Sequence, residues 1–103
     1  MYGTVAKFRV PAENLAPLRA LVEAEETLGI DGYLGSDLLV CDNHPDTLML
    51  VVRFRDRASY VANAESPEQD ERYREFRALM AEDPEWFDGE WASLAMTASP
   101  GSP

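Results

Sequence analysis

Two polar side chains three residues apart, Tyr60 and Asn63, are the best candidates for chemistry in this sequence. Asp56 is a suitable N-cap for a short helix that continues to Ala64, and residues three apart on a helix lie on one face. A phenol hydroxyl and a carboxamide can both hydrogen-bond an oxygen of a bound molecule. The alternative is that Tyr60 is a partly buried packing residue and that Asn63 is a helix cap or a surface amide.

A second group of reactive side chains lies close together in the sequence: Cys41, Asp42, His44 and Asp46. The segment reads as the tip of a β-hairpin, where four side chains cannot all converge, and Pro45 restricts the turn further. Recognised zinc spacings draw paired ligands from two places, so we predict no metal site. A nucleophile pair of Cys41 and His44 would lack a helix N-terminus or an orienting third group to lower the thiol pKa.

Large apolar side chains could form the walls of a pocket. Tyr73, Phe76 and Met80 repeat at helical spacing, a pattern that usually indicates packing, so they are candidates for walls and not for catalysis. Trp86 and Trp91 are large, rigid and amphipathic, which suits either a pocket rim or a subunit interface. The sequence favours the interface for this pair, and Trp86 is also a candidate for contact with a substrate.

These candidates must be positioned by elements that cover a hydrophobic β-hairpin. Its two apolar runs, Tyr33 to Cys41 and Thr47 to Phe54, are joined by a segment rich in turn-forming residues. Within the second run, Leu48 to Val52 is continuously apolar, which predicts a strand buried on both faces. Gly32 and Gly35 at the start of the hairpin indicate a bulge or a close approach of backbone.

The rest of the chain supplies two strands and two helical regions. Alternation predicts a first strand, and the last pattern before the tail predicts a fourth. Ser66, with Pro67 next and Gln69 three residues on, predicts an N-cap and a capping box, which divides the second helical region in two. The predicted elements are a strand over Tyr2 to Val10, a helix from an Asn14 cap to Gly29, a helix from Asp56 to Ala64, a helix from Ser66 to before Pro84, and a strand over Glu90 to Thr97.

The resulting order, β, α, β, β, α, β, predicts an α+β fold of the ferredoxin-like type. In that fold an antiparallel four-stranded sheet has both helical regions on one face. The other face should be polar, yet the strand over Thr47 to Phe54 is apolar on both sides. A second copy packed on that face would explain this, so we expect a homodimer that closes a dimeric α/β barrel.

Composition limits the classes of partner. A chain of 103 residues with 46% hydrophobic residues forms one packed domain, which we place at residues 1–97, with a disordered tail at residues 98–103. A net charge of −10 disfavours binding to nucleic acid or to an anionic membrane. There is no signal-peptide pattern, no spanning run and a single cysteine, so we expect a cytoplasmic protein. No glycine-rich phosphate loop follows a strand, which disfavours a nucleotide cofactor.

Three stretches carry a resemblance to a known family: Gly32 to Ser36, Leu48 to Phe54, and Asp56 to Tyr60. With them the sequence resembles the antibiotic biosynthesis monooxygenase-like family of dimeric α/β barrels over about Tyr2 to Trp91. The resemblance implies a ferredoxin-like subunit, a homodimer and a pocket between sheet and helices. Members of that family include monooxygenases that oxidise aromatic polyketide intermediates to quinones without metal or flavin, haem-degrading enzymes, and isomerases or signal-degrading proteins.

Two departures from the family pattern matter. Many members carry an acidic residue two positions before the aromatic that closes the third strand; with Phe54 as that aromatic, the position here is Val52. Many also carry a histidine in the first piece of the second helix, where this sequence has Asn63. Haem degradation needs a histidine ligand, and the only histidine is His44 in the predicted turn. The resemblance therefore favours the branch that oxidises its substrate without a cofactor.

The leading hypothesis is a homodimeric monooxygenase that acts on a small aromatic or polyketide-like molecule with no cofactor. The alternative is a non-catalytic homodimer that binds a small hydrophobic molecule or supports a neighbouring enzyme of a pathway. Under the first hypothesis, Tyr60 and Asn63 orient the substrate oxygen, and Tyr73, Phe76, Met80 and Trp86 line the substrate site and exclude water.

Overall fold

The computed structural model describes residues 1–44 and 46–95. The predicted βαββαβ order and α+β class are confirmed. None of the helices in these two ranges is long and apolar enough to cross a membrane. The elements are β1 (Tyr2–Arg9), α1 (Leu15–Ala24), β2 (Tyr33–Val40), β3 (Thr47–Phe54), α2 (Arg57–Ala64), α3 (Pro67–Ala78) and β4 (Glu85–Glu90), with one-turn 3-10 helices at Ala12–Asn14 and Glu25–Thr27 on either side of α1.

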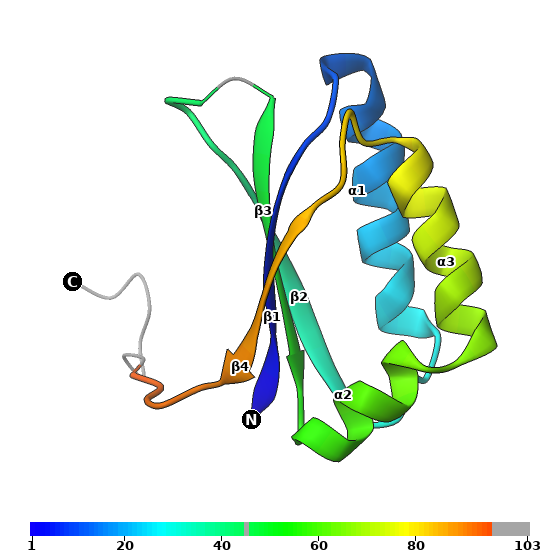
Figure 1. The fold of residues 1–103 in the computed structure, drawn as a ribbon, viewed down its shortest axis with the longest axis vertical. Helices are drawn as coiled ribbons and strands as arrows, with labels where there is room; N and C mark the ends of the chain where they lie inside the picture. The colour runs from blue at the N-terminus through cyan, green and yellow to red at the C-terminus, as the bar shows by residue number, and fades with distance from the viewer. Residues whose placement is uncertain (45, 96–103) are drawn as a thin grey trace.

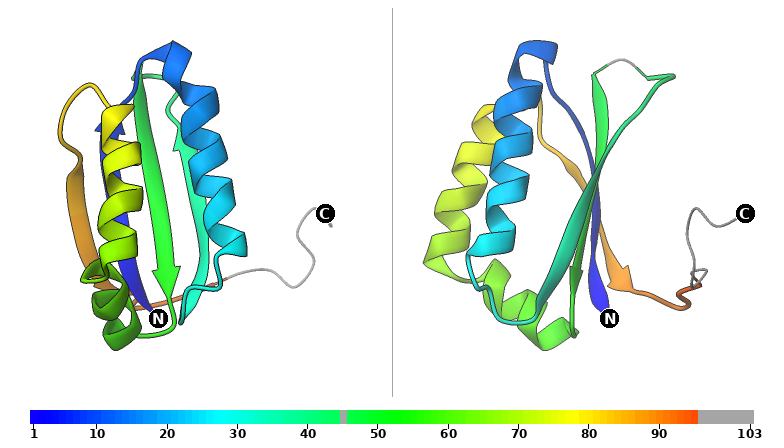
Figure 2. Two further views of the ribbon diagram at one scale, coloured as in Figure 1. Left: turned by 90° about the vertical axis from the view of Figure 1, so that its right-hand side faces the viewer. Right: turned by 180° about the vertical axis from the view of Figure 1, so that it is seen from behind.

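The four strands form one antiparallel sheet in the order β2-β3-β1-β4. All three α-helices lie on the same side of this sheet, with α1 and α3 running antiparallel along it and α2 at one end (Figure 1, Figure 2). The fold is therefore a two-layer, ferredoxin-like arrangement in which β1 and β3 are the central strands. Within residues 1–44 and 46–95, no helix lies on the opposite face of the sheet (Figure 1, Figure 2).

Strand alternation decides which side chains meet the helices. On β1, Thr4, Ala6 and Phe8 are buried on the helix side, as the period-two pattern predicts, while Lys7 and Arg9 on the other side are exposed. The inward side chains of β1 and β3 pack against apolar residues of α1 and α3. The core consists of Ala6, Phe8, Val10, Leu18, Val22, Leu48, Leu50, Phe76 and Met80.

The junction between α2 and α3 follows the predicted caps, with one difference. Ser66 Oγ accepts a hydrogen bond from the Gln69 backbone N–H at 3.1 Å, and Pro67 occupies the first helical position. The second half of the capping box does not form, because the Ser66 backbone N–H donates to the Asn63 carbonyl oxygen instead. The Gln69 side chain is thereby free to bond Asn63 and Arg72.

The predicted last strand over Glu90 to Thr97 is wrong, because β4 spans Glu85–Glu90. Asp88 and Gly89 have the composition of a turn, yet pairing with β1 overrides that local preference: Trp86 lies opposite Ala6 and Asp88 opposite Thr4. Thr97 and the predicted tail at residues 98–103 lie outside the described residues. The shift places Trp86 and Asp88 within the sheet, on the side that faces the helices.

Gly32 and Gly35 mark the irregular entry to β2, as predicted. The pairing with β3 shifts between Tyr33 and Gly35, which is a β-bulge. Gly32 has a φ of 78°, and a Cβ there would collide with the side chain of Ser59 in α2. Glycine therefore allows the start of β2 to lie directly against α2.

The helix-free face of the sheet carries apolar side chains, as predicted for β3. Val51 lies opposite both Val5 and Asp37, and Phe87 is 53% exposed on the same face. Leu39 is also exposed there. Of the two valines Val51 and Val52, it is therefore Val51 that lies on the face a second copy of the chain would contact.

Candidate functional site

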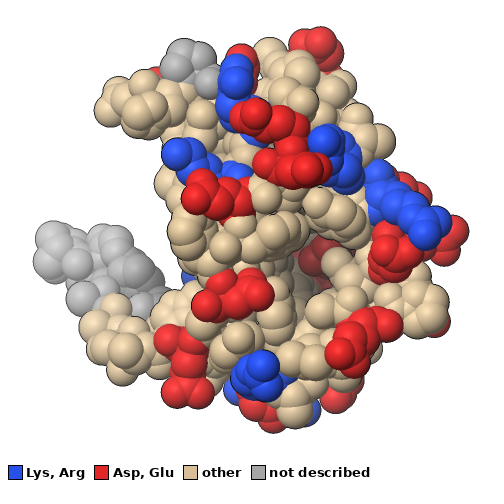
Figure 3. All heavy atoms as spheres, viewed as in Figure 1, with Lys and Arg blue, Asp and Glu red and all other residues tan. Residues whose placement is uncertain are grey.

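A cavity lies between the helix-covered face of the sheet and helices α2 and α3. Its volume is about 370 Å³, within the range of small-molecule sites, and the molecular surface is hollowed between sheet and helices (Figure 3). Most of its lining is apolar, from side chains such as Ala6, Leu50 and Phe54. All six residues that the sequence singled out line this cavity: Tyr60, Asn63, Tyr73, Phe76, Met80 and Trp86.

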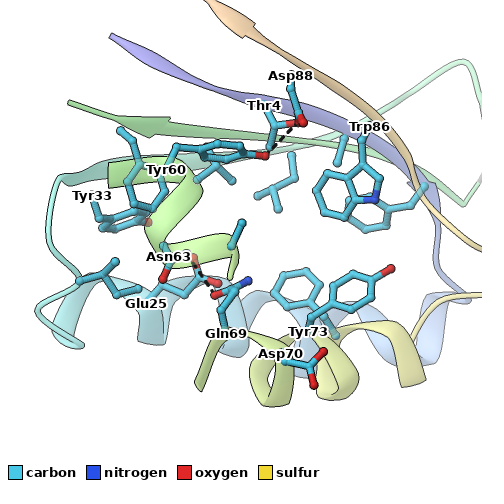
Figure 4. A pocket seen from close by; sticks show the side chains of 18 of the residues that line it. Thr4, Glu25, Tyr33, Tyr60, Asn63, Gln69, Asp70, Tyr73, Trp86 and Asp88 are labelled. Atoms are coloured by element: carbon cyan, nitrogen blue, oxygen red, sulfur yellow. Dashed lines mark hydrogen bonds between the residues drawn. The ribbon is translucent and has the colours of Figure 1, made fainter. Parts of the chain in front are cut away.

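Tyr60 reaches from α2 across the end of the cavity to the sheet (Figure 4). Its ring packs against Phe54 and Tyr2, with ring centroids 5.6 and 5.2 Å apart, and its hydroxyl donates to Asp88 Oδ1 at 3.0 Å. The ring of Tyr60 is therefore a packing group, while its hydroxyl presents a polar atom at the cavity. The hydrogen bond between this residue and a bound molecule stays a prediction. The lone pairs of its oxygen can still accept from a bound molecule.

The surroundings of Tyr60 keep its phenol protonated. Burial and the neighbouring Asp88 carboxylate together raise the pKa of Tyr60 to about 12. The nearby Thr4 hydroxyl acts in the opposite direction, although its contact with Tyr60 lacks the geometry of a hydrogen bond. Tyr60 is thus a hydrogen-bonding group and not a base at ordinary pH.

Asn63 lies at the last turn of α2 and belongs to a polar network at the junction with α3. Its Oδ1 accepts from Arg72 Nη2 at 3.2 Å, and its Nδ2 donates to Gln69 Oε1 at a long 3.4 Å. Gln69 Oε1 in turn accepts from Arg72. The network fixes which end of the carboxamide carries the amino group, so Asn63 has a second N–H available to a bound molecule.

The four large side chains predicted as pocket walls differ in how deeply they are buried. Tyr73 from α3 and Trp86 from β4 contact each other at the cavity wall, with ring centroids 6.0 Å apart, and Trp86 is 45% exposed. Phe76 and Met80 are buried and belong to the core as well as to the cavity wall. Trp86 therefore lies at the cavity rim, whereas Trp91 lies under Arg53 on the helix-free face.

Several polar lining residues were not among the sequence candidates: Thr4, Glu25, Tyr33, Gln69, Asp70 and Asp88. Strand alternation could have identified Thr4, since it shares a face with Ala6 and Phe8. Asp88 was missed because the last strand was predicted to begin only at Glu90, after the turn-like composition of Asp88-Gly89. Glu25 follows α1 in the 3-10 helix Glu25–Thr27, and no local pattern marked it as a lining residue.

The ionisable lining is acidic. Glu25, Asp70 and Asp88 line the cavity, whereas no Lys or Arg is among the described residues that do so. Burial raises the pKa of Glu25, and the positive charge of Arg72 lowers it by less. The Asp70 carboxylate points away from the cavity (Figure 4) and pairs with Arg74 at 2.7 Å, so Glu25 and Asp88 give the lining its acidic character. A negatively charged molecule would meet repulsion in this cavity.

The two departures from the family pattern have clear positions. Val52 lines the cavity, so an apolar side chain occupies a place where an acidic one would alter the site directly. His44 is exposed in the loop between β2 and β3 and is not a lining residue. Within residues 1–44 and 46–95, no group of three or more His, Cys, Asp or Glu side chains could hold a metal ion.

Comparison with known proteins identifies relatives by sequence family and by fold. The sequence model of the family named antibiotic biosynthesis monooxygenase matches residues 1–79. No curated protein sequence matches the chain.

Solved structures share the fold at low sequence identity. A Deinococcus radiodurans protein assigned to the antibiotic biosynthesis monooxygenases superposes with a TM-score of 0.73 at 17% identity, covering 96% of this chain and 100% of the other. A variant of SnoaB, a cofactor-independent oxygenase from Streptomyces nogalater, gives 0.75 at 15% identity and covers 90% and 94%. A Mycobacterium tuberculosis protein gives 0.71 at 22%, covering 92% and 98%.

Proposed function

Because this chain belongs to the antibiotic biosynthesis monooxygenase family, we propose that it is a monooxygenase that oxidises a small aromatic or polyketide-like molecule without metal or flavin. The observation that carries the proposal is the apolar cavity, with the Tyr60 hydroxyl and the Asn63 carboxamide at its wall. SnoaB, which has the same fold and is a cofactor-independent oxygenase, supports the absence of a resident cofactor by analogy.

In the proposed reaction the substrate supplies the electrons. A phenol that loses its proton becomes an anion that can reduce molecular oxygen at a ring carbon. One oxygen atom stays on the ring, the other leaves as water together with the two hydrogens that the substrate loses, and the product is a quinone. The protein has to orient the phenol oxygen, stabilise its negative charge and keep water out.

The two polar residues divide these roles. Tyr60 donates its own proton to Asp88 and orients the substrate oxygen through this carboxylate, to which the substrate hydroxyl donates. Asn63 offers an N–H to the oxygen as charge develops on it, and the bond from Arg72 to Asn63 Oδ1 holds the carboxamide in that orientation. Tyr73, Phe76, Met80 and Trp86 form the water-excluding wall.

The test is oxygen uptake and quinone formation with a naphthol or a hydroxylated anthrone. We expect Asn63→Ala to lower the turnover rate by about a hundredfold, as for loss of one donor to a developing anion. Tyr60→Phe should lower it by about tenfold through loss of an orienting hydrogen bond. Both variants should keep the subunit composition of the wild type.

Two matched variants serve as controls. Tyr2→Phe also removes a phenol hydroxyl but not a lining one, and Asn43→Ala removes an exposed carboxamide in the β2–β3 loop. Neither should change turnover. If Tyr60→Phe and Asn63→Ala turn over substrate at the wild-type rate, the assigned roles are wrong.

One observation favours a non-catalytic alternative: the cavity has Val52 where many members of the family carry an acidic residue. A protein that only binds a small hydrophobic molecule, or supports a neighbouring enzyme, needs the cavity but not the reaction. Tight binding of naphthols without any oxygen uptake would support this alternative and reject the monooxygenase.

We also propose that the protein is a homodimer formed through the helix-free face of the sheet. That face has an apolar character, which the described residues of one chain leave uncovered; its apolar side chains include Val5, Val51, Leu39 and Phe87. Two of its charged groups already have partners: Arg53 pairs with Asp37 at 2.6 Å and lies over the Trp91 ring, and Arg9 pairs with Glu82 at 3.8 Å. Lys7, near the end of β1, has no ion pair among the described residues, so we expect it at the rim of the symmetric interface.

A further inference from the structure

Thr4 has a buried hydroxyl that the protein leaves unused. The residue is 3% exposed, lies in the middle of β1 and lines the cavity from the sheet side. Its Oγ1 has no hydrogen-bond partner among the described residues. Buried polar atoms are rarely left without a partner, because the lost contact with water then goes uncompensated. The position therefore points to a bound group that completes the bond.

Asp88 lies directly opposite Thr4 on the neighbouring strand. The two residues form a cross-strand pair between β1 and β4 on the helix-covered face, where opposite side chains are close neighbours. Asp88 Oδ1 accepts from Tyr60, and this is the one hydrogen bond formed by its side chain within the described part of the chain. Figure 4 shows Thr4 and Asp88 together beside the hydroxyl end of Tyr60.

The pair has complementary chemistry. A threonine hydroxyl can donate one hydrogen bond and accept others, whereas an ionised carboxylate can only accept. A group that accepts from Thr4 and donates to Asp88 would satisfy both residues, and a neutral hydroxyl does this with a single oxygen. A carboxylate or phosphate could accept from Thr4 but would be repelled by Asp88 and by the acidic lining.

We propose that Thr4 and Asp88 form a subsite that selects a neutral hydroxyl group of the ligand. The inference rests on the proposed function, because it uses the same cavity, and it narrows the substrate class to uncharged hydroxylated aromatics. Tyr60 is the positioning residue of the subsite, since its bond to Asp88 Oδ1 holds the carboxylate beside Thr4 (Figure 4). The apolar floor around it, from Ala6, Leu50 and Val52, accommodates the ring.

The test is equilibrium binding under nitrogen, so that no turnover occurs, with four probes of similar size: naphthol, methoxynaphthalene, naphthoate and naphthylmethylammonium. The wild type should bind naphthol about tenfold more tightly than methoxynaphthalene, which cannot donate to Asp88. Naphthoate should bind most weakly. Tightest binding of the ammonium probe would overturn the proposal in favour of a cationic ligand.

Thr4→Val keeps the shape of the side chain and removes the hydroxyl. We expect a loss of about three- to tenfold in naphthol affinity and no loss for methoxynaphthalene. The free variant should unfold at the same or a higher temperature than the wild type, because an unsatisfied buried hydroxyl has been removed. Equal losses for both probes would mean that Thr4 only shapes the cavity, which would overturn the proposal.

Asp88→Asn should lower naphthol affinity by about tenfold and raise that of naphthoate. The matched control is Asp83→Asn, which removes the same charge from the loop before β4, where Asp83 pairs with Arg77 outside the cavity. If both variants change the binding of the probes equally, general charge and not the subsite is responsible. The result is independent of the proposed reaction, whose failure would appear as an absence of oxygen uptake by the wild type.

Discussion

The hydroxyl of Tyr60 connects the two layers of the molecule, since it extends from α2 to Asp88 on β4. Its ring is held between Phe54 and Tyr2, so the hydroxyl has little freedom to leave Asp88. A donor in contact with a carboxylate is stabilised in its protonated form. The position of Tyr60 in the cavity wall therefore depends on the ionisation of two groups, its own phenol and the Asp88 carboxylate.

This linkage can be measured by titrating the tyrosines through the absorbance of tyrosinate. We expect one step near pH 12 in the wild type, because burial and Asp88 raise the pKa of Tyr60 to about 12 from 10.0. That step should be missing in Tyr60→Phe and should move to lower pH in Asp88→Asn. Asp83→Asn should leave it in place, and a wild type in which every tyrosine titrates near pH 10 would contradict the contact.

The sign of the effect on stability follows from the same shift. The pKa of Tyr60 is higher in the folded protein than in the unfolded chain, so the folded state holds its proton more tightly. The contribution is fully present below pH 10 and is lost as the pH rises towards 12. The free energy of unfolding of the wild type should therefore approach that of Tyr60→Phe over this range.

At the scale of residues, the sequence indicated the lining residues Tyr60 and Asn63 on α2 but not Thr4 and Asp88 on the sheet, and the roles of all four stay predictions. Tyr60 and Asn63 were found because helical spacing places residues three apart on one face. Thr4 and Asp88 come together only through the pairing of β1 with β4, two strands at opposite ends of the sequence. No local pattern contains that pairing, and the turn-like composition of Asp88-Gly89 concealed one of its members.

The start of β2 and the first turn of α2 meet at a contact that admits no side chain. Gly32 lies against Ser59, whose backbone N–H donates to Asp56 Oδ1 at 2.8 Å to begin α2. The Arg55 backbone N–H also donates to the Gly32 carbonyl oxygen at 2.7 Å. This contact fixes α2, and with it Tyr60, relative to the sheet.

Gly32→Ala should therefore be strongly destabilising. Gly29→Ala is a matched control, since Gly29 also has a positive φ of 66° but has open space where a Cβ would lie. Both variants bear the cost of backbone strain, and only the first adds a steric clash. We expect urea unfolding to show Gly32→Ala to be less stable than Gly29→Ala by about 1–3 kcal/mol. Equal stabilities would mean that α2 can move away from β2 without cost.

Elements with strong local signals were predicted accurately, and the one that depends on a distant partner was not. The hairpin strands and the starts of α2 and α3 follow from alternation, turn residues and caps, all of which act within a few residues. β4 contains Asp88 and Gly89, which are poor strand formers, and its pairing with β1 outweighs that preference. Gly89 faces Gly3 on the helix-free side, where neither position carries a side chain.

At the scale of the whole molecule, the helix-free face predicts an assembly that one substitution should disrupt. Val51→Lys places a charge at the centre of the proposed interface, where it would have no partner, at a cost of about 3–5 kcal/mol. Native mass spectrometry should detect a dimer for the wild type and a monomer for this variant. Ala20→Lys, on the exposed side of α1, should remain dimeric. A stable Val51→Lys dimer would place the interface elsewhere.

The central position of β1 has a consequence for synthesis on the ribosome. β1 pairs with β3 and β4, so both of its neighbours are made after it, and the second is complete only at residue 90. Until then, one whole edge of β1 in the nascent chain lacks its partner strand, and such edges can pair with other chains. A message truncated before the codons for β4 would therefore release a product prone to aggregate, even though it contained most of the hydrophobic core.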